Sequence, residues 1–146
     1  MPYREKIAWL SLAAMVVSYG PYFAYLAWAQ PSAAVPNLPL LGVLAAVSAV
    51  RVAVLGPLWL WFRASTPADD RLMDERDRDI ERRAVGVAYY VLMTGALLTA
   101  MVMPFTKAGW DIVNAGLAAI VIAEITRDGL VLWAYRRRGE AAGWAA

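Results

Sequence analysis

Four long apolar stretches dominate the sequence, at about residues 7–29, 38–62, 84–105 and 110–135. A helix needs roughly 20 mostly apolar residues to cross about 30 Å of hydrocarbon, and each stretch is long enough to do so. Of the 146 residues, 61% are hydrophobic and only 18% are charged, which leaves little chain for a water-facing domain. We therefore predict an all-α membrane protein with four transmembrane helices in a single domain, residues 1–146.

Lysine and arginine residues outside the apolar stretches are distributed unevenly. Two lie at the N-terminus, six in residues 63–83 and three directly after residue 135, whereas Lys107 alone lies in the turn between the third and fourth stretches. Basic residues favour the cytoplasmic side of a membrane. We therefore expect both termini and the charged segment in the cytoplasm.

The segment 63–83 holds six arginines and seven carboxylates. Thr66 followed by Pro67 fits a helix N-cap with proline at the first helical position, and no helix breaker follows before Pro104. We therefore expect the third apolar helix to extend into the cytoplasm as a charged helix over residues 67–83. Each acid lies within a helical turn of an arginine, which favours a salt-bridged, solvated helix over a metal site.

One side of this charged helix is a candidate contact surface for another protein. At helical spacing, Met73 and Ile80 begin a thin apolar stripe that continues through Ala84 and Val87. A partner helix can pack against such a stripe. The predicted partner-binding residues are Met73, Asp74, Glu75, Arg76 and Ile80.

Charged residues also occur inside two apolar stretches. A charge near the bilayer centre costs a few kcal/mol, so it normally faces the bundle interior and has a partner. Arg51 and Glu124 each lie 12 residues before the arginine that ends their stretch, hence at similar depth. The spacing also places Asn114 on the face of Glu124 and Asp128. We predict an intramembrane charge cluster in which Glu124 or Asp128 neutralises Arg51, formed by Arg51, Asn114, Glu124, Arg127 and Asp128.

Three roles for this cluster stay open at this point. It forms a neutral group that only fixes the order of the helices, or Glu124 or Asp128 exchanges protons or binds a polar ligand. In the third alternative, Arg127 and Asp128 reach toward the membrane surface and take no part.

The chain has no cysteine and no histidine, so thiolate nucleophiles and thiolate or imidazole metal ligands are excluded. It also has no glycine-rich phosphate loop, no nucleophile elbow and no basic patch free of compensating acids. We therefore expect a protein that is not an enzyme, holds no cofactor or metal, and does not bind nucleic acid directly.

Residues 74–84, with the sequence Asp-Glu-Arg-Asp-Arg-Asp-Ile-Glu-Arg-Arg-Ala, resemble the cytoplasmic DERDxxIxxxA signature of a family of small bacterial four-span inner-membrane proteins of unknown function. The resemblance covers these residues and the four-span layout. It implies a multi-pass protein of the bacterial cytoplasmic membrane. Such proteins are frequently encoded beside a helix-turn-helix regulator, which implies a cytoplasmic regulatory partner. The resemblance implies no catalytic residue, and the intramembrane charges are not part of the signature.

These observations lead to three hypotheses. The first is a non-enzymatic sensor or regulatory partner that acts through the charged helix. The second is a small proton-coupled transporter that uses Glu124 or Asp128 paired with Arg51. The third is an accessory subunit of a larger membrane complex. Small-residue faces, such as Ala45, Ala49 and Ala53 at four-residue spacing, also favour a homodimer within the lipid bilayer.

Overall fold

A computed structural model describes residues 3–29, 31, 37–65, 67, 74–107 and 109–143 of the chain. Within them lie four long helices: α1 (Tyr3–Ala29), α2 (Leu38–Ser65), α3 (Glu75–Leu97) and α4 (Trp110–Gly143). After α3 the chain continues through a π-helical turn, η2 (Leu98–Val102), and a 3-10 turn, η3 (Met103–Phe105). These residues contain no strand, so the predicted all-α class is confirmed.

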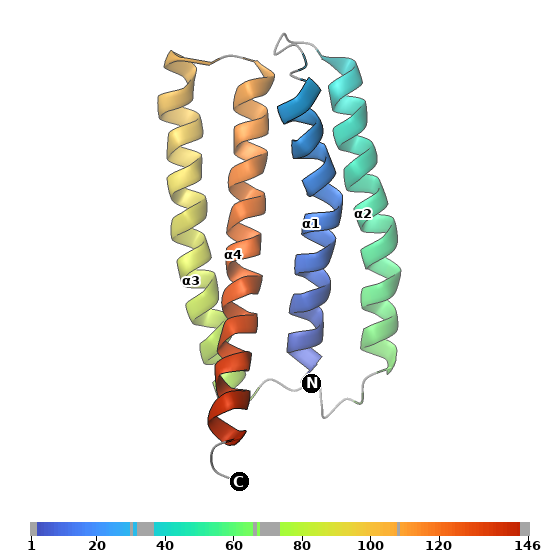
Figure 1. Cartoon of the computed structure of the whole chain (residues 1–146), viewed down its shortest axis with the longest axis vertical. Helices are drawn as coiled ribbons and strands as arrows, with labels where there is room; N and C mark the ends of the chain where they lie inside the picture. Colours follow the sequence, from blue (N-terminus) through green and yellow to red (C-terminus); the bar gives the residue numbers. More distant parts are fainter. Residues whose placement is uncertain are drawn as a thin grey trace.

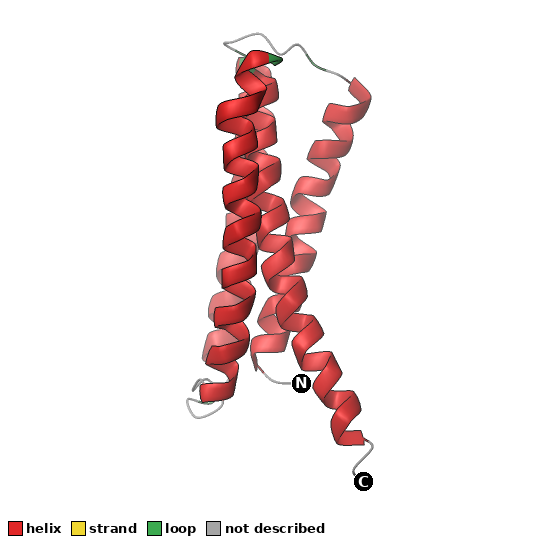
Figure 2. Ribbon diagram, turned by 90° about the vertical axis from the view of Figure 1, so that its left-hand side faces the viewer, coloured by secondary structure: helices red, strands yellow, loops and turns green. Residues whose placement is uncertain are grey.

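The helices form an up-and-down bundle in the spatial order α3, α4, α1, α2 (Figure 1). α4 packs against α3 on one side and α1 on the other, and α2 packs against α1. The start of α1 and the end of α4 lie at the same end of the bundle, which we call the terminal end, and the opposite end is the hairpin end (Figure 1). At the terminal end, the last turns of α4 extend past the other helices (Figure 2).

Three segments are long and apolar enough to cross a membrane: Arg4–Ala29, Leu38–Ser65 and Glu75–Phe105. α4 is 34 residues long but is not among them, because Glu124, Arg127 and Asp128 interrupt its apolar run. The structure is therefore a helical bundle with three helices able to span a membrane.

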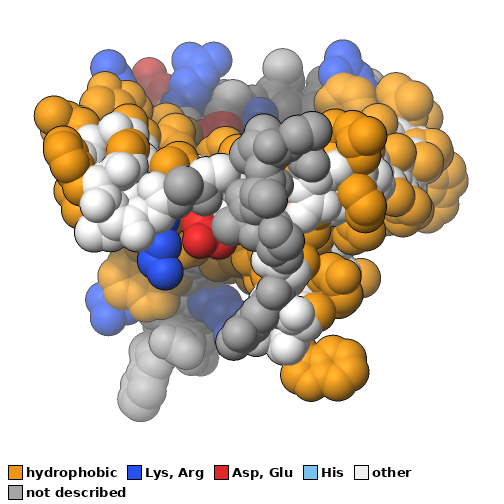
Figure 3. All heavy atoms as spheres, turned by 90° about the horizontal axis from the view of Figure 1, so that it is seen from above, with side chains coloured by type: hydrophobic (Ala, Val, Ile, Leu, Met, Phe, Trp, Pro, Cys, Tyr) orange, Lys and Arg blue, Asp and Glu red, His pale blue; other side chains and the backbone are white. Residues whose placement is uncertain are grey.

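Large apolar side chains cover much of the outside of the bundle. Viewed along the bundle axis, hydrophobic side chains surround the helices (Figure 3). Val17, Val52 and Tyr90 are 71–72% exposed. Extensive exposed apolar surface marks an interaction with a membrane or another protein, and helices of this length suit a membrane.

The core lies mainly between α1 and α4, toward the hairpin end. Tyr19 of α1 packs against Val121 of α4, and Tyr22 of α1 clusters with Leu40 of α2 and Trp110 of α4. Leu40 is the one buried residue in the described length of α2. α2 is therefore anchored chiefly at the hairpin end.

Small residues let α3 lie close to α4. Ala84 and Ala88 are buried, and a Cβ atom at Gly95 would collide with the side chain of Ala119. Without a hydrophobic driving force between helices in lipid, such close backbone approach is a main source of helix association. Gly95 therefore allows a close contact between α3 and α4 at Ala119.

The start of α3 differs from the prediction. Asp74 has an extended backbone (φ −66°, ψ 154°), and its carboxylate accepts a 2.8 Å hydrogen bond from the Glu75 backbone N–H. Asp74 is therefore the N-cap, and the helix begins at Glu75. Pro67 lies outside any helix, so the predicted helix start at Pro67 is wrong. Thr66 and residues 68–73 lie outside the described residues.

The end of this helix also has a feature that the sequence analysis did not predict. α-Helical pitch stops at Leu97 and gives way to the wider η2 turn and the tighter η3 turn, which contains Pro104. Proline has no backbone N–H, so it cannot donate a hydrogen bond to the carbonyl four residues earlier. A change of helical pitch lets the neighbouring backbone groups form other hydrogen bonds. Thr99 Oγ1 adds a 2.7 Å hydrogen bond to the Gly95 carbonyl.

Candidate functional site

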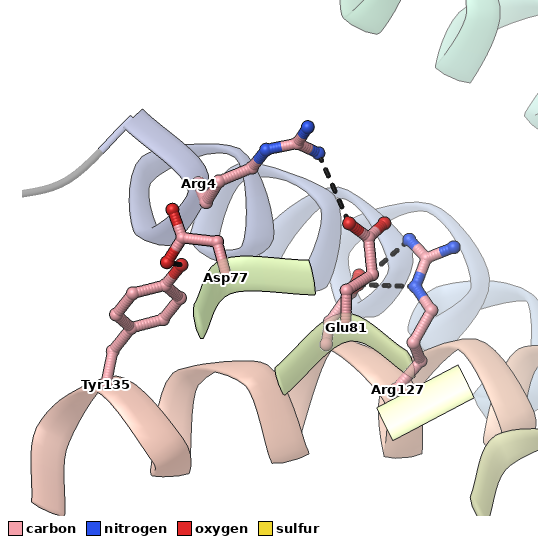
Figure 4. A network of polar contacts seen from close by, with 6 residues as sticks. Arg4, Asp77, Glu81, Arg127 and Tyr135 are labelled. Atoms are coloured by element: carbon pink, nitrogen blue, oxygen red, sulfur yellow. Dashed lines mark hydrogen bonds and ion pairs between the residues drawn. The ribbon is translucent and has the colours of Figure 1, made fainter. Parts of the chain in front are cut away.

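Ionisable side chains from three helices meet near the terminal end of the bundle (Figure 4). On α4, Arg127 forms ion pairs with Glu124 (Nη1 to Oε2, 3.3 Å) and with Asp128 (Nη2 to Oδ1, 3.0 Å). Arg127 Nε donates a further hydrogen bond to Asp128 Oδ1 at 3.1 Å. The single cation in this part of α4 is thus shared by two acids of its own helix.

Asp128 is the only buried charged side chain in the part of the chain that the structure describes, with 2% of its surface exposed. Its Oδ1 accepts both hydrogen bonds from Arg127, whereas its Oδ2 has no hydrogen-bond partner among the described residues. An unsatisfied buried oxygen costs about 1–3 kcal/mol, and more when the group is charged. Asp128 therefore has one buried oxygen that is available to accept a further hydrogen bond.

A cavity of about 60 Å³ adjoins Asp128. Side chains from α1 (Arg4, Ile7), α3 (Asp77, Glu81) and α4 (Tyr135) also line it. A water molecule needs roughly 15 Å³ of such space and two or more polar partners, so the cavity meets both conditions.

Two further contacts join α1 and α4 to the start of α3. Arg4 Nη1 lies 3.5 Å from Glu81 Oε2, and the Tyr135 hydroxyl donates a 2.6 Å hydrogen bond to Asp77 Oδ1 (Figure 4). We call the whole set the polar junction: Arg4, Asp77, Glu81, Glu124, Arg127, Asp128 and Tyr135. It ties three helices together at one end of the bundle.

The structure does not bring Arg51 to this junction. Its guanidinium lies over the Tyr19 ring, with 5.4 Å from Cζ to the ring centroid. Its Nε is buried and has no hydrogen-bond partner within the described residues. The predicted pairing of Arg51 with Glu124 or Asp128 is therefore not found. α1 lies between α2 and this part of α4 (Figure 1), and the cation that pairs with both acids is Arg127.

Asn114 is likewise separate from the charges. Its Oδ1 accepts a 2.8 Å hydrogen bond from the buried hydroxyl of Tyr22, which joins α4 to α1 toward the hairpin end. Ten residues separate Asn114 from Glu124, or about 15 Å along a helix. Asn114 and Glu124 can therefore lie on the same face of α4 without belonging to the same cluster.

The predicted partner-binding residues also lie differently. Ile80 is 7% exposed and Ala84 is 2% exposed, and both belong to the buried face of α3, so this part of the apolar stripe is not open to a partner helix. Val87, further along the stripe, is 48% exposed. Asp74, Glu75 and Arg76 are exposed. Met73 lies outside the described residues.

The charges of α4 lie at the edge of the apolar band rather than at its centre. Asp128 lines the same cavity as Ala8, close to the start of the α1 apolar stretch, and α3 places Asp77 and Glu81 beside it. The side chains of Glu124 and Arg127 are 37% and 38% exposed.

Arginine–tryptophan pairs mark the same end of the bundle. The guanidinium of Arg63 lies over the Trp59 ring, that of Arg136 over Trp9 and that of Arg137 over Trp133. Tryptophan and arginine both favour the interface between hydrocarbon and water. These pairs indicate that the polar junction lies near such an interface.

Sequence reasoning missed Arg4, Asp77, Glu81 and Tyr135. The contact between Asp77 and Tyr135 could have been predicted from the short connection near residue 107. An antiparallel helical hairpin that turns there places the two residues about opposite each other. No signal of this kind connects Arg4 to Glu81, which requires the position of α1 relative to α3.

The fold and the site define a class: an all-helical bundle with three helices able to span a membrane and a polar junction at one end. No family model, curated protein or solved structure matches the chain. The described residues contain no group of acids positioned to hold a metal ion.

Proposed function

We propose that this is a four-span protein of the bacterial cytoplasmic membrane, with both termini in the cytoplasm, that acts as a non-enzymatic regulatory partner through the start of α3, residues 74–83. α4 serves as the fourth span. It packs between α3 and α1 along the bundle, and both of its acids at 124–128 pair with Arg127, which lowers the cost of placing them near lipid. The orientation follows from the lysine and arginine distribution.

The proposal rests on the difference between the two sides of this segment, one in contact with other helices and one exposed. One side of α3 is engaged, since Asp77 bonds Tyr135 of α4 and Glu81 pairs with Arg4 of α1. The other side presents exposed charges, including Arg78 and Arg82. A protein that binds the exposed side could therefore change the contacts of this segment with α1 and α4 in the polar junction.

Site-specific photocrosslinking in native membranes tests this function. A photoreactive residue replaces Arg78 or Arg82, and in the control it replaces Tyr90, which is exposed on the apolar part of α3. We expect the first two positions to yield a common crosslinked cytoplasmic protein that the Tyr90 position does not yield. Identical adducts from all three positions, or no protein adduct from Arg78 and Arg82, would refute the proposal.

The unpartnered Oδ2 of Asp128 and its adjoining cavity favour a second candidate function, proton-linked transport. The carrier would be the Glu124, Arg127 and Asp128 group, without Arg51. Proteoliposomes containing a pH-sensitive dye and an imposed potential would report proton flux. We expect Asp128→Asn to abolish it and Asp111→Asn, at the other end of α4, to retain it. Absence of flux in the unmodified protein would eliminate this candidate.

A further inference from the structure

A second cavity, unrelated to the polar junction, lies between the start of α3 and the end of α4. Its volume is about 290 Å³, close to the lower end of the roughly 300–1,000 Å³ range of small-molecule sites. Its apolar surface comes from both helices: Ile80, Ala84, Val87, Leu130, Trp133 and Ala134. We call it the α3–α4 groove.

The groove changes in polarity along its length. Val87 and Leu130 lie toward the apolar part of the bundle, whereas Arg76 and Arg83 lie toward the start of α3. Arg137 adds a third guanidinium next to the groove, 4.1 Å from the centroid of the Trp133 ring, and Trp133 is 53% exposed.

Positive charge predominates at the polar end of the groove. Among the described residues, Asp79 is the one acid that lines it, against the two lining arginines and Arg137 beside them. Neither ion pairs nor hydrogen bonds within the described residues engage Arg76 or Arg83 with an acid. Arginine binds phosphate oxygens with two parallel hydrogen bonds, so this end is suited to a phosphodiester.

We propose that the α3–α4 groove binds one anionic phospholipid of the cytoplasmic leaflet. The phosphate lies between Arg76 and Arg83, and the upper part of an acyl chain lies against Val87, Leu130 and Trp133. Basic grooves between helices at the cytoplasmic surface recognise such headgroups in this way. This inference depends on the membrane placement proposed above but not on a protein partner, so a failed crosslinking experiment would leave it intact.

Native mass spectrometry of the full-length protein in detergent tests the proposal. The protein is titrated with phosphatidylglycerol and, separately, with phosphatidylcholine of the same acyl chains. The expected result is a single retained phosphatidylglycerol at concentrations where phosphatidylcholine is not retained. Equal retention of the two lipids would overturn the proposal, since the groove would then recognise acyl chains alone.

Two double variants separate the groove from general electrostatic attraction. Arg76→Gln with Arg83→Gln removes the groove arginines, and Arg78→Gln with Arg82→Gln removes the same charge from the same helix segment at two positions that do not line the groove. Each groove arginine should contribute about fivefold to the affinity, so the groove variant should lose roughly 30-fold in phosphatidylglycerol affinity. The affinity of the control variant should change by no more than about threefold. Equal losses in both variants would show a diffuse surface effect and overturn the proposal.

Competition with glycerol 3-phosphate distinguishes a lipid from a soluble phosphate. Because the apolar part of the groove contributes to binding, we expect no displacement of phosphatidylglycerol by glycerol 3-phosphate at the same concentration. Displacement at equal concentration would mean that the groove is a site for soluble phosphate compounds instead.

Discussion

The Tyr135 hydroxyl donates a 2.6 Å hydrogen bond to Asp77 Oδ1 and so joins the last turns of α4 to the first turn of α3. The two residues are 58 positions apart in the chain. Hydrogen bonds to a charged acceptor contribute more to stability than neutral ones do. This contact therefore holds the two helix ends together where no apolar band encloses them.

Tyr135→Phe should lower the stability of the protein by about 1–2 kcal/mol, because Asp77 loses a donor while the ring stays in place. The midpoint of thermal unfolding in detergent measures this loss. Tyr89→Phe is the matched control, since Tyr89 is exposed and its ring contact with Tyr90 survives the change. A loss of the same size in both variants would contradict the assigned role of Tyr135.

Gly95→Ala should destabilise the bundle by about 1–3 kcal/mol, the usual cost of overpacking, because its methyl group would collide with the Ala119 side chain. Gly86→Ala provides the control, since a Cβ there meets open space, and it should be neutral or slightly stabilising. Thermal unfolding is again the measurement.

A second change in the same background sharpens this test. Ala119→Gly removes the obstructing methyl group, so the double variant Gly95→Ala with Ala119→Gly should recover most of the lost stability. No recovery would show that α3 and α4 do not meet at this point.

Arg127→Gln should cost about 2–3 kcal/mol, because it leaves the acids Glu124 and Asp128 without their cation. This lies at the low end of the cost of breaking a buried pair, since Arg127 is over a third exposed. Arg51→Gln should cost about 1 kcal/mol or less, the size of its interaction with the Tyr19 ring.

A double-mutant cycle identifies the true partner of Asp128. Asp128→Asn should couple with Arg127→Gln by 0.5 kcal/mol or more and should be additive with Arg51→Gln, as expected for groups without direct contact. Coupling to Arg51 instead would restore the pairing that the sequence predicted and reject the observed one.

The absence of cysteine makes the proposed topology directly testable. Single substitutions Ser65→Cys, Thr106→Cys and Arg137→Cys would be treated with a membrane-impermeant maleimide on intact spheroplasts and again after permeabilisation. We expect Thr106→Cys to react in both cases and the other two only after permeabilisation. If Arg137→Cys reacts together with Thr106→Cys, α4 does not cross the membrane.

Long apolar runs made most of the helices predictable. The expected stretches 7–29 and 38–62 lie within α1 and α2, because roughly 20 successive apolar residues have few alternatives to a helix. The start of α3 was not predicted, because Thr66 followed by Pro67 was taken as the N-cap, and aspartate caps helices equally well. Asp74 has the role in the structure.

Neighbour relationships were much harder to predict than the helices themselves. α2 is apolar on every side, so its sequence does not indicate which face meets another helix, and the partner of Arg51 was assigned by depth alone. The real determinants are local: Gly95 against Ala119 sets the α3–α4 contact, and Arg127 lies next to Asp128 in the chain. The cation that pairs with both acids comes from their own helix and not from α2.

The position of α4 between α1 and α3 has a consequence for biosynthesis. Of the four helices described, α4 is the last to leave the ribosome, yet Tyr22 and Asp77 both find their partners on it. The first three helices are therefore synthesised before either contact can form. Closure of the bundle is necessarily a late event, completed only after translation has passed Tyr135.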